Sequence, residues 1–380
     1  MDLKKDLPAI FDDFADARKT AFMNVKKIKD QNKPLIGIYC TYFPQELAEA
    51  MGAAVVGLCS VSDETIPAAE EDLPRNLCPL IKSSYGFAKT DKCPFFYFSD
   101  LVVAETTCDG KKKMYEYMAE FKPLHIMELP NRCGEDDIQA FRKEIIKMKE
   151  KLEEFFGVTI TEDDIRRGIK IKNAERTAVK DFYEIMKADP CPITGTELMN
   201  ALDAASFSFN RSEIPAQMAE LKAKIEAEGK VQERKPRILI TGCPMGGATM
   251  KVCSAIEAAG GQVVFFENCT GGKAIEINVD ESNPDVYDAL ARKYMAIGCS
   301  VMNPNDNRIK LLDAAIDDYK IEGVVDMTLQ ACHTYALEGL RVKRFCEDEK
   351  KIPYMQVETD YSQADVGQLN TRCAAFVEML

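Results

Sequence analysis

Cysteine is the residue type that offers the most distinctive chemistry in this chain. Fourteen of its 380 residues are cysteine, only two are histidine and none is tryptophan. In a reducing compartment such an excess is more often explained by metal or redox chemistry than by disulfides. Cysteine also serves as a small buried hydrophobe, so a structural role stays open for any single one of them.

The spacing of the cysteines argues against several familiar sites. No Cys-x-x-Cys pair occurs anywhere in the chain, which disfavours zinc ribbons, thioredoxin-like redox pairs and ferredoxin-type clusters. Ligands scattered along the sequence suit a cluster held between two domains. Coordination by thiolates alone favours iron and sulfide over a hard cation.

The order of strand and helix signals predicts how the thiols are positioned. Short apolar runs, each followed by a polar turn and a helical pattern, alternate in two separate stretches of the chain, which is typical of a parallel, doubly wound sheet. We expect the strands at 35–39, 53–58, 100–104, 125–129, 237–241, 262–267, 323–328 and 353–358. Each stretch opens with a strand that runs into a cysteine and a nearby proline, so a duplicated domain is a natural hypothesis.

Four segments follow from this pattern. We expect an amphipathic N-terminal helix within 1–33, a first α/β domain at 34–133, a charged helical connector at 134–234 and a second α/β domain at 235–380. The predicted fold class is therefore α/β, with two doubly wound, mostly parallel-sheet domains of Rossmann or flavodoxin-like type.

Six cysteines are predicted to lie at, or within a few residues of, the carboxyl end of a strand. In open α/β sheets ligands bind outside these strand ends, so two sheets that face one another could direct thiolates into one cleft. The alternative is that free cysteines simply collect at buried strand ends. The six are Cys40, Cys59, Cys108, Cys243, Cys269 and Cys332.

The remaining polar motifs allow two interpretations each. His333 directly follows Cys332 and is the candidate catalytic residue, whereas His125 lies in an apolar run and fits a hydrogen-bonded structural residue. The segment 111–113, three lysines, fits a solvated helix face, with anion binding as the sharper alternative. The glycine-rich turns at 242–247 and 269–273 match neither the dinucleotide fingerprint nor the phosphate loop. We therefore expect no ATP hydrolysis by this chain.

Charge and hydropathy exclude some partners. The chain carries 49 basic and 62 acidic residues, a formal net charge of −13, which disfavours nucleic acid and anionic membrane surfaces. No window reaches the roughly 18 apolar residues of a membrane span, and the first residues lack the apolar core of a signal peptide. A cytoplasmic protein is the expectation.

Four motifs together carry a resemblance to a known family. They are Gly37-Ile38-Tyr39-Cys40-Thr41-Tyr42-Phe43-Pro44-Gln45-Glu46-Leu47, Asn76-Leu77-Cys78-Pro79, Glu105-Thr106-Thr107-Cys108-Asp109-Gly110-Lys111-Lys112 and Gln330-Ala331-Cys332-His333-Thr334. With these motifs the chain resembles the 2-hydroxyacyl-CoA dehydratase and benzoyl-CoA reductase family over nearly its whole length. The stretch 72–86, with Thr241-Gly242-Cys243-Pro244 and Glu267-Asn268-Cys269-Thr270-Gly271, is most similar to the double-cubane cluster protein branch.

The resemblance implies a set of metal ligands. In dehydratase subunits three cysteines hold one [4Fe–4S] cluster, and their motifs fall on Cys78, Cys108 and Cys332. In the double-cubane branch two cubanes share a bridging sulfide, giving an [8Fe–9S] cluster with six cysteine ligands. We assign the other three to Cys40, Cys243 and Cys269, with Cys59 and Cys299 as alternatives. The cysteines expected to be structural are Cys133, Cys191, Cys253, Cys346 and Cys373.

The resemblance also implies a function and partners. The expected protein is a homodimeric iron–sulfur reductase component of anaerobic metabolism. It would receive low-potential electrons from a separate ATP-hydrolysing iron–sulfur activator and reduce a small molecule. Two other functions stay open: the [4Fe–4S] subunit of a 2-hydroxyacyl-CoA dehydratase, and a redox or cluster scaffold that turns nothing over.

Overall fold

The computed structural model describes residues 16–229, 231–244 and 246–380. Its first element is helix α1 (Asp16–Asp30), so the predicted N-terminal helix is confirmed for its described part. Residues 1–15 of that prediction lie outside the described residues. None of the helices among the described residues is both long and apolar enough to cross a membrane.

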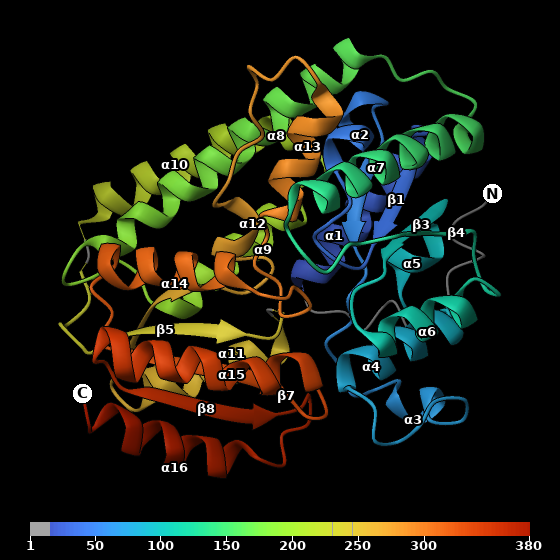
Figure 1. Ribbon diagram of the computed structural model, residues 1–380. Coiled ribbons are helices and arrows are strands. Elements are labelled where there is room, and N and C mark those ends of the chain that lie inside the picture. The colour runs from blue at the N-terminus through green and yellow to red at the C-terminus, as the bar shows by residue number, and fades with distance from the viewer. Residues whose placement is uncertain (1–15, 230, 245) are drawn as a thin grey trace.

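Two four-stranded sheets, all parallel, organise the chain (Figure 1). All eight predicted strands are confirmed, with ends that differ by one or two residues. The first sheet contains β1 (Leu35–Ile38), β2 (Ala54–Gly57), β3 (Leu101–Glu105) and β4 (Leu124–Met127). The second contains β5 (Arg237–Gly242), β6 (Gln262–Phe266), β7 (Gly323–Leu329) and β8 (Tyr354–Thr359).

The two sheets share one topology. Their strand orders are β2-β1-β3-β4 and β6-β5-β7-β8, so each sheet reverses its winding direction beside its first strand. The strands β1, β3, β5 and β7 are buried along their whole length, as expected when helices cover both faces of a parallel sheet. The predicted fold class is therefore confirmed, and the shared order supports the duplication hypothesis.

Helices connect the strands and cover the sheets. Those that belong to the first sheet are α2 (Gln45–Ala50), α3 (Ile66–Ala69), α4 (Pro79–Lys89), α5 (Pro94–Phe98) and α6 (Asp109–Met118). Those that belong to the second are α11 (Gly247–Ala258), α12 (Gly272–Ile275), α14 (Asp306–Asp318), α15 (His333–Arg344), its π-helical extension η4 (Phe345–Lys350) and α16 (Val366–Val377). Helix α13 (Val286–Met295) follows β6 in the chain but packs in the core of the first sheet.

The segment between the sheets is helical, as the sequence predicts. It holds α7 (Glu135–Phe156), α8 (Glu162–Tyr183), the 3-10 turn η2 (Glu184–Lys187), α9 (Gly195–Ser206), the turn η3 (Arg211–Glu213) and α10 (Ile214–Glu228). Helix α8 runs along the molecule beside both halves (Figure 1).

A buried ion pair joins α8 to elements of both halves. Arg176 of α8 donates to Glu46 of α2, and the Tyr294 hydroxyl of α13 donates to the other carboxylate oxygen at 2.7 Å. Burial alone would raise the pKa of Glu46, but the charges of Arg176 and Lys293 lower it to about 2. A Cβ on Gly168 would lie 2.4 Å from the carbonyl oxygen of Glu46, so only glycine lets α8 approach α2 this closely. The contact ties α8 and α13, which lies after β6 in the chain, to α2 of the first sheet.

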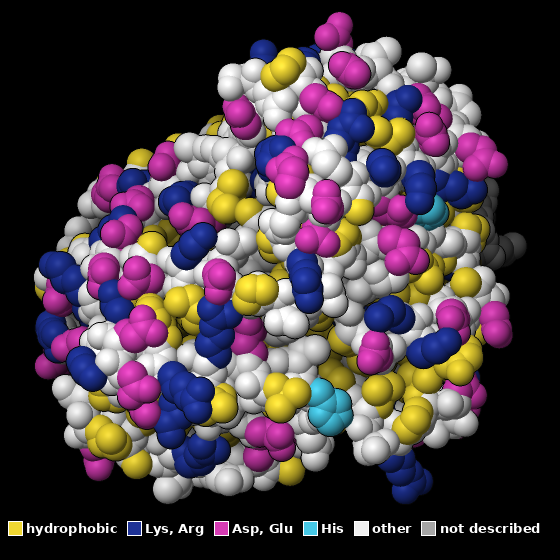
Figure 2. Space-filling model, in the orientation of Figure 1, with side chains coloured by type: hydrophobic (Ala, Val, Ile, Leu, Met, Phe, Trp, Pro, Cys, Tyr) yellow, Lys and Arg dark blue, Asp and Glu magenta, His cyan; other side chains and the backbone are white. Residues whose placement is uncertain are grey.

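Acidic and basic side chains are interspersed over the face of the molecule shown in Figure 2. The excess of acidic residues is therefore not concentrated into one patch on that face.

Candidate metal centre

The shared topology places six cysteines at matching strand ends in the two sheets. Each sheet carries one thiol after its first, second and third strand, and the gap between the first and third strands is the topological switch point where open sheets bind ligands. The matching pairs are Cys40 with Cys243, Cys59 with Cys269, and Cys108 with Cys332. The predicted strand-end positions of all six are confirmed.

Three of the six predicted ligands lie at helix N-caps, as does Cys93 before α5. Cys78 precedes α4, Cys108 precedes α6 and Cys332 precedes α15. The backbone N–H groups of Ile81, Lys111 and Tyr335, in the first turns of these helices, act to lower the pKa values of the three thiols and so favour their anionic form. The positive end of a helix dipole acts in the same direction. These are the residues that the family resemblance assigns to one [4Fe–4S] cluster, and their common capping geometry was not visible in the sequence.

The thiols of Cys78, Cys243 and Cys332 meet across the two halves. The neighbouring thiols of Cys243 and Cys78 hold the pKa of Cys332 well below the ordinary range. Burial raises the pKa of Cys243, whose sulfur also accepts a hydrogen bond from the Leu329 N–H at 3.2 Å. One thiolate held by two thiols is the arrangement expected where several cysteines are gathered for metal binding.

Unusual backbone precedes two of these three cysteines. Gly242 has φ of +111°, and a Cβ there would lie 2.1 Å from the Met327 carbonyl oxygen. Ala331 has φ of +57°, a left-handed conformation that costs free energy for a residue with a Cβ. The chain therefore turns sharply at the ends of β5 and β7, and these turns direct Cys243 and Cys332 toward one another.

A second group surrounds Lys111. Its ammonium Nζ lies 3.1 Å from the sulfur of Cys40, 3.7 Å from that of Cys59 and 3.2 Å from the Tyr39 carbonyl oxygen. Lys111 is only 7% exposed, so the interpretation of all three lysines at 111–113 as a solvated helix face is wrong for the first of them. It is buried because the first turn of α6 faces the end of β1, where Cys40 lies.

A third group surrounds Lys273 at the end of β6. Its ammonium Nζ lies 3.1 Å from Glu267 Oε1 and 2.9 Å from the Tyr335 hydroxyl. Burial raises the pKa values of Cys269 and Cys299, and the charge of Lys273 opposes that rise for both. Cys299 thus shares the surroundings of Cys269.

The three groups form one buried region, the thiol region. Burial raises the pKa of Cys269, which also feels the charges of Lys111 and Cys59 from the other half. Burial likewise raises the pKa of Cys108, on which Lys111 and Cys332 both act. The hydroxyl of Tyr361 has a raised pKa from burial and from three thiols of both halves, Cys78, Cys59 and Cys243. Thiols and a lysine of one half therefore act on thiols of the other half.

The histidines and the other cysteines lie in different surroundings. His333 is the first residue of α15 and is exposed. His125 lies on β4, but its buried Nε2 has no hydrogen-bond partner, so the expectation of a hydrogen-bonded structural residue is wrong for that atom. Of the cysteines expected to be structural, Cys133 is exposed and the others are buried: Cys191, Cys253, Cys346 and Cys373.

The donor set suits a polynuclear cluster better than a single ion. Within the described residues, no three His, Cys, Asp or Glu side chains are placed to hold one metal ion. The thiols instead come from strand ends of both sheets and from helix N-termini. Soft sulfur donors of this kind are the ligands used in iron–sulfur binding.

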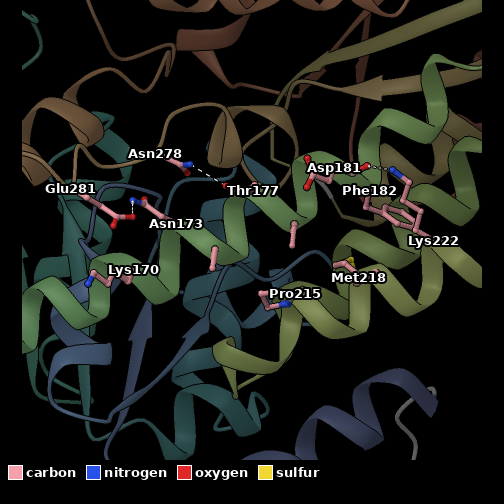
Figure 3. A pocket seen from close by; sticks show the side chains of 13 residues that line it. Lys170, Asn173, Thr177, Asp181, Phe182, Pro215, Met218, Lys222, Asn278 and Glu281 are labelled. Carbon is pink, nitrogen blue, oxygen red and sulfur yellow. Dashed lines mark hydrogen bonds between the residues drawn. The ribbon is translucent and has the colours of Figure 1, made fainter.

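A groove of about 700 Å³ lies elsewhere, between α8, α10 and the segment before α13 (Figure 3). Asn278 donates to Thr177, and Lys222 donates to the Asp181 carbonyl oxygen, along its walls. No cysteine lines it. The thiol region and this groove are therefore separate features.

Sequence reasoning missed the buried carboxylates and tyrosines around the thiols. One signal was available. Glu105 is followed six residues later by Lys111, Glu267 is followed six residues later by Lys273, and each lysine comes directly after a glycine with a cysteine inside the interval. Tyr361 lies outside any such motif, and its position among the thiols depends on the fold alone.

Comparison with known proteins gives a consistent result. The family model described as 2-hydroxyglutaryl-CoA dehydratase, D-component, matches residues 40–380. The chain is 56% identical to "Putative dehydratase subunit YjiM" of Escherichia coli (strain K12), over all of both chains. It is 24% identical to the (R)-phenyllactyl-CoA dehydratase beta subunit of Clostridium sporogenes, covering 97% of this chain and 98% of that one. It is 20% identical to one subunit of the benzoyl-CoA reductase of Thauera aromatica, covering 93% of this chain and 92% of that one.

Proposed function

This chain belongs to the 2-hydroxyglutaryl-CoA dehydratase D-component family, and on that premise we propose that it is an iron–sulfur reductase component. In this proposal it holds a double-cubane [8Fe–9S] cluster between its two halves. It receives low-potential electrons from a separate ATP-hydrolysing activator and passes them to a small-molecule substrate. The proposed assembly is a homodimer.

The observation that carries the proposal is the meeting of thiols from both halves. Cys78 follows the first sheet's second strand, whereas Cys243 and Cys332 follow strands of the second sheet, yet Cys332 lies near enough to the other two thiols for both to act on its pKa. Cys108, Cys40 and Cys269 lie in electrostatic range of this group or of its neighbours. Six thiols is the number that a double cubane needs.

Each set of side chains has a part in this proposal. The bound cluster supplies one-electron transfer at a potential set by its type, charge, hydrogen bonds and exposure. The N-terminal ends of α4, α6 and α15 stabilise the thiolates of Cys78, Cys108 and Cys332. Burial of the strand-end thiols keeps water away from the ligands. His333 is the proposed catalytic residue, since its imidazole is exposed and directly follows Cys332 in the chain.

The test is anaerobic purification followed by iron and acid-labile sulfide determination and EPR of the reduced protein. The proposal predicts about eight irons and nine sulfides per chain. Cys332→Ser should lose most of this iron. Cys373→Ala removes a buried thiol on α16, outside the thiol region, and should keep it. A wild-type protein that stays without iron after reconstitution contradicts the proposal.

A second candidate function is the [4Fe–4S] subunit of a 2-hydroxyacyl-CoA dehydratase. Two observations favour it. Of the six predicted ligands, only Cys78, Cys108 and Cys332 lie at helix N-caps, and a relative that covers 97% of this chain is named (R)-phenyllactyl-CoA dehydratase beta subunit. About four irons per chain, with dehydration of a 2-hydroxyacyl-CoA in the presence of activator and a second subunit, would identify this function. Iron without turnover of any substrate would leave the scaffold function.

A further inference from the structure

Two lysines of this chain are buried beside thiols, one in each half. Lys111 is 7% exposed and Lys273 is 3% exposed. Both occur in the recurring segment in which a strand-end glutamate is followed six residues later by Gly-Lys, namely Glu105 to Lys111 and Glu267 to Lys273. A buried ammonium group is costly unless an anion compensates it, so the anion that each one faces is informative.

Lys273, in the C-terminal half, has a carboxylate partner. Lys273 Nζ lies 3.1 Å from Glu267 Oε1, with both side chains fully buried. The hydroxyl of Tyr335 is a further neighbour at 2.9 Å. The charge of Lys273 is therefore balanced by a carboxylate within the protein itself, although it still acts on the pKa values of Cys269 and Cys299.

Lys111, in the N-terminal half, faces sulfur atoms instead. The described contacts of Lys111 Nζ are Cys40 Sγ, Cys59 Sγ and the Tyr39 carbonyl oxygen, and none of these is a carboxylate. The nearest glutamate of its own segment, Glu105, accepts a hydrogen bond from the Phe43 N–H at 2.7 Å and has its other oxygen without a partner. Lys111 thus brings into the thiol region a positive charge whose closest described contacts are sulfur atoms, while Glu105 feels that charge without forming an ion pair with it.

We infer that Lys111 is a positioning residue for electron transfer, whose ammonium raises the reduction potential of the cluster held beside Cys40 and Cys59. This inference rests on the proposed function and deepens it. When one electron passes from the donor to the cluster, no bond forms or breaks, and the cluster becomes more negative by one charge. A fixed positive charge 3.1 Å from a ligand sulfur stabilises the reduced form more than the oxidised form.

The experiment is an EPR-monitored redox titration of the anaerobic protein, after iron has been measured in each variant. Lys111→Met should need a more negative potential for the same reduced fraction, with at least a tenfold lower ratio of reduced to oxidised cluster at the wild-type midpoint, or about 59 mV for one electron. Lys111→Arg keeps the charge and should titrate close to the wild type.

The double variant Lys273→Met with Glu267→Gln is the matched control. It also removes a buried ammonium near thiols, but together with its carboxylate, so its midpoint should stay near that of the wild type. Lys111→Met that titrates with the wild type, or a control that shifts as far, overturns the inference.

Loss of iron is also decisive. If Lys111→Met binds no iron while Lys111→Arg binds it fully, the positive charge is needed for the cluster itself, which supports the inference. If both variants are empty, the lysine has only a structural role and the inference is overturned. A wild-type protein without iron would refute the proposed function, whereas a loaded wild type with an unshifted Lys111→Met refutes this inference alone.

Discussion

The two halves of this molecule have the same strand order and carry thiols at matching strand ends, but they treat buried charge differently. In the N-terminal half, Lys111 contacts the sulfurs of Cys40 and Cys59. In the C-terminal half, Lys273 contacts the carboxylate of Glu267. The duplicated architecture therefore fixes where ligands gather, whereas the partner of each ammonium decides how much positive charge reaches them.

The C-terminal half extends this neutralisation into a network. Arg308 is fully buried and lies 2.6 Å from Glu338, 3.6 Å from Glu267 and 3.8 Å from Asp326. It also donates to the Thr241 hydroxyl at 2.8 Å, directly behind the turn that carries Cys243. One arginine thus holds three carboxylates beneath the second sheet's strand ends. Among the described contacts of Lys111 in the N-terminal half, no residue holds carboxylates as Arg308 does.

Removal of Arg308 should produce the largest effect and tests this difference directly. Arg308→Met leaves the carboxylates of Asp326 and Glu338 without this cation, while Glu267 keeps Lys273, so we expect a loss of about 3–5 kcal/mol in the free energy of unfolding. Urea denaturation followed by circular dichroism measures it. Arg308→Lys keeps the charge and should recover part of the loss. A loss below about 1 kcal/mol would show that the network does not stabilise the C-terminal half.

The contact between the halves should give the next largest effect, through pH. The folded pKa of Glu46 is about 2, well below the ordinary value of 4.5. Its contribution to stability, on the order of 3 kcal/mol, is fully present above pH 4.5 and is lost as the pH falls toward 2. Denaturant unfolding at several pH values measures this dependence.

Glu46→Gln is the control for that pH dependence. It should lower stability at pH 7 and flatten the profile between pH 4.5 and 2, because the titrating group is gone. The same slope in Glu46→Gln and the wild type would show that other carboxylates cause the acid sensitivity.

A backbone difference between the halves predicts an intermediate effect. Gly242, before Cys243, has a positive φ and no space for a Cβ, whereas the matching position before Cys40 is Tyr39. Gly242→Ala should cost about 1–3 kcal/mol and reduce iron binding. Gly57→Ala, at an open position at the end of β2, should change stability by less than about 1 kcal/mol. Equal stabilities of the two variants would mean that the turn before Cys243 can relax.

The smallest effect is expected at Ala331, before Cys332. Its φ of +57° costs an alanine free energy that glycine does not pay. Ala331→Gly should therefore raise the free energy of unfolding by about 0.5–1 kcal/mol, less than the full strain because glycine has more freedom when unfolded. Thermal unfolding compared with the wild type measures it. A clear destabilisation would show that the left-handed conformation is not strained here.

The sequence predicts the strands of the two sheets well, but it predicts poorly which charged side chains are buried and what they contact. Alternation of apolar runs and helical patterns locates all eight strands, because a strand buried on both faces must be apolar along its length. The strand-end thiols follow from the same pattern. The burial of Lys111 does not, because it depends on contacts with residues 52 and 71 positions away in the chain. The meeting of Cys78 with Cys243 and Cys332 likewise requires both halves to be in place.

Native mass spectrometry of the anaerobically purified protein tests the central claim most directly, alongside Cys78→Ser and Cys243→Ser, one ligand variant from each half. If the thiols of both halves hold one cluster, the wild-type chain carries an added mass of about eight irons and nine sulfides, and each variant loses most of it. A wild-type chain without this added mass, or a variant that keeps all of the added mass found in the wild type, contradicts the account.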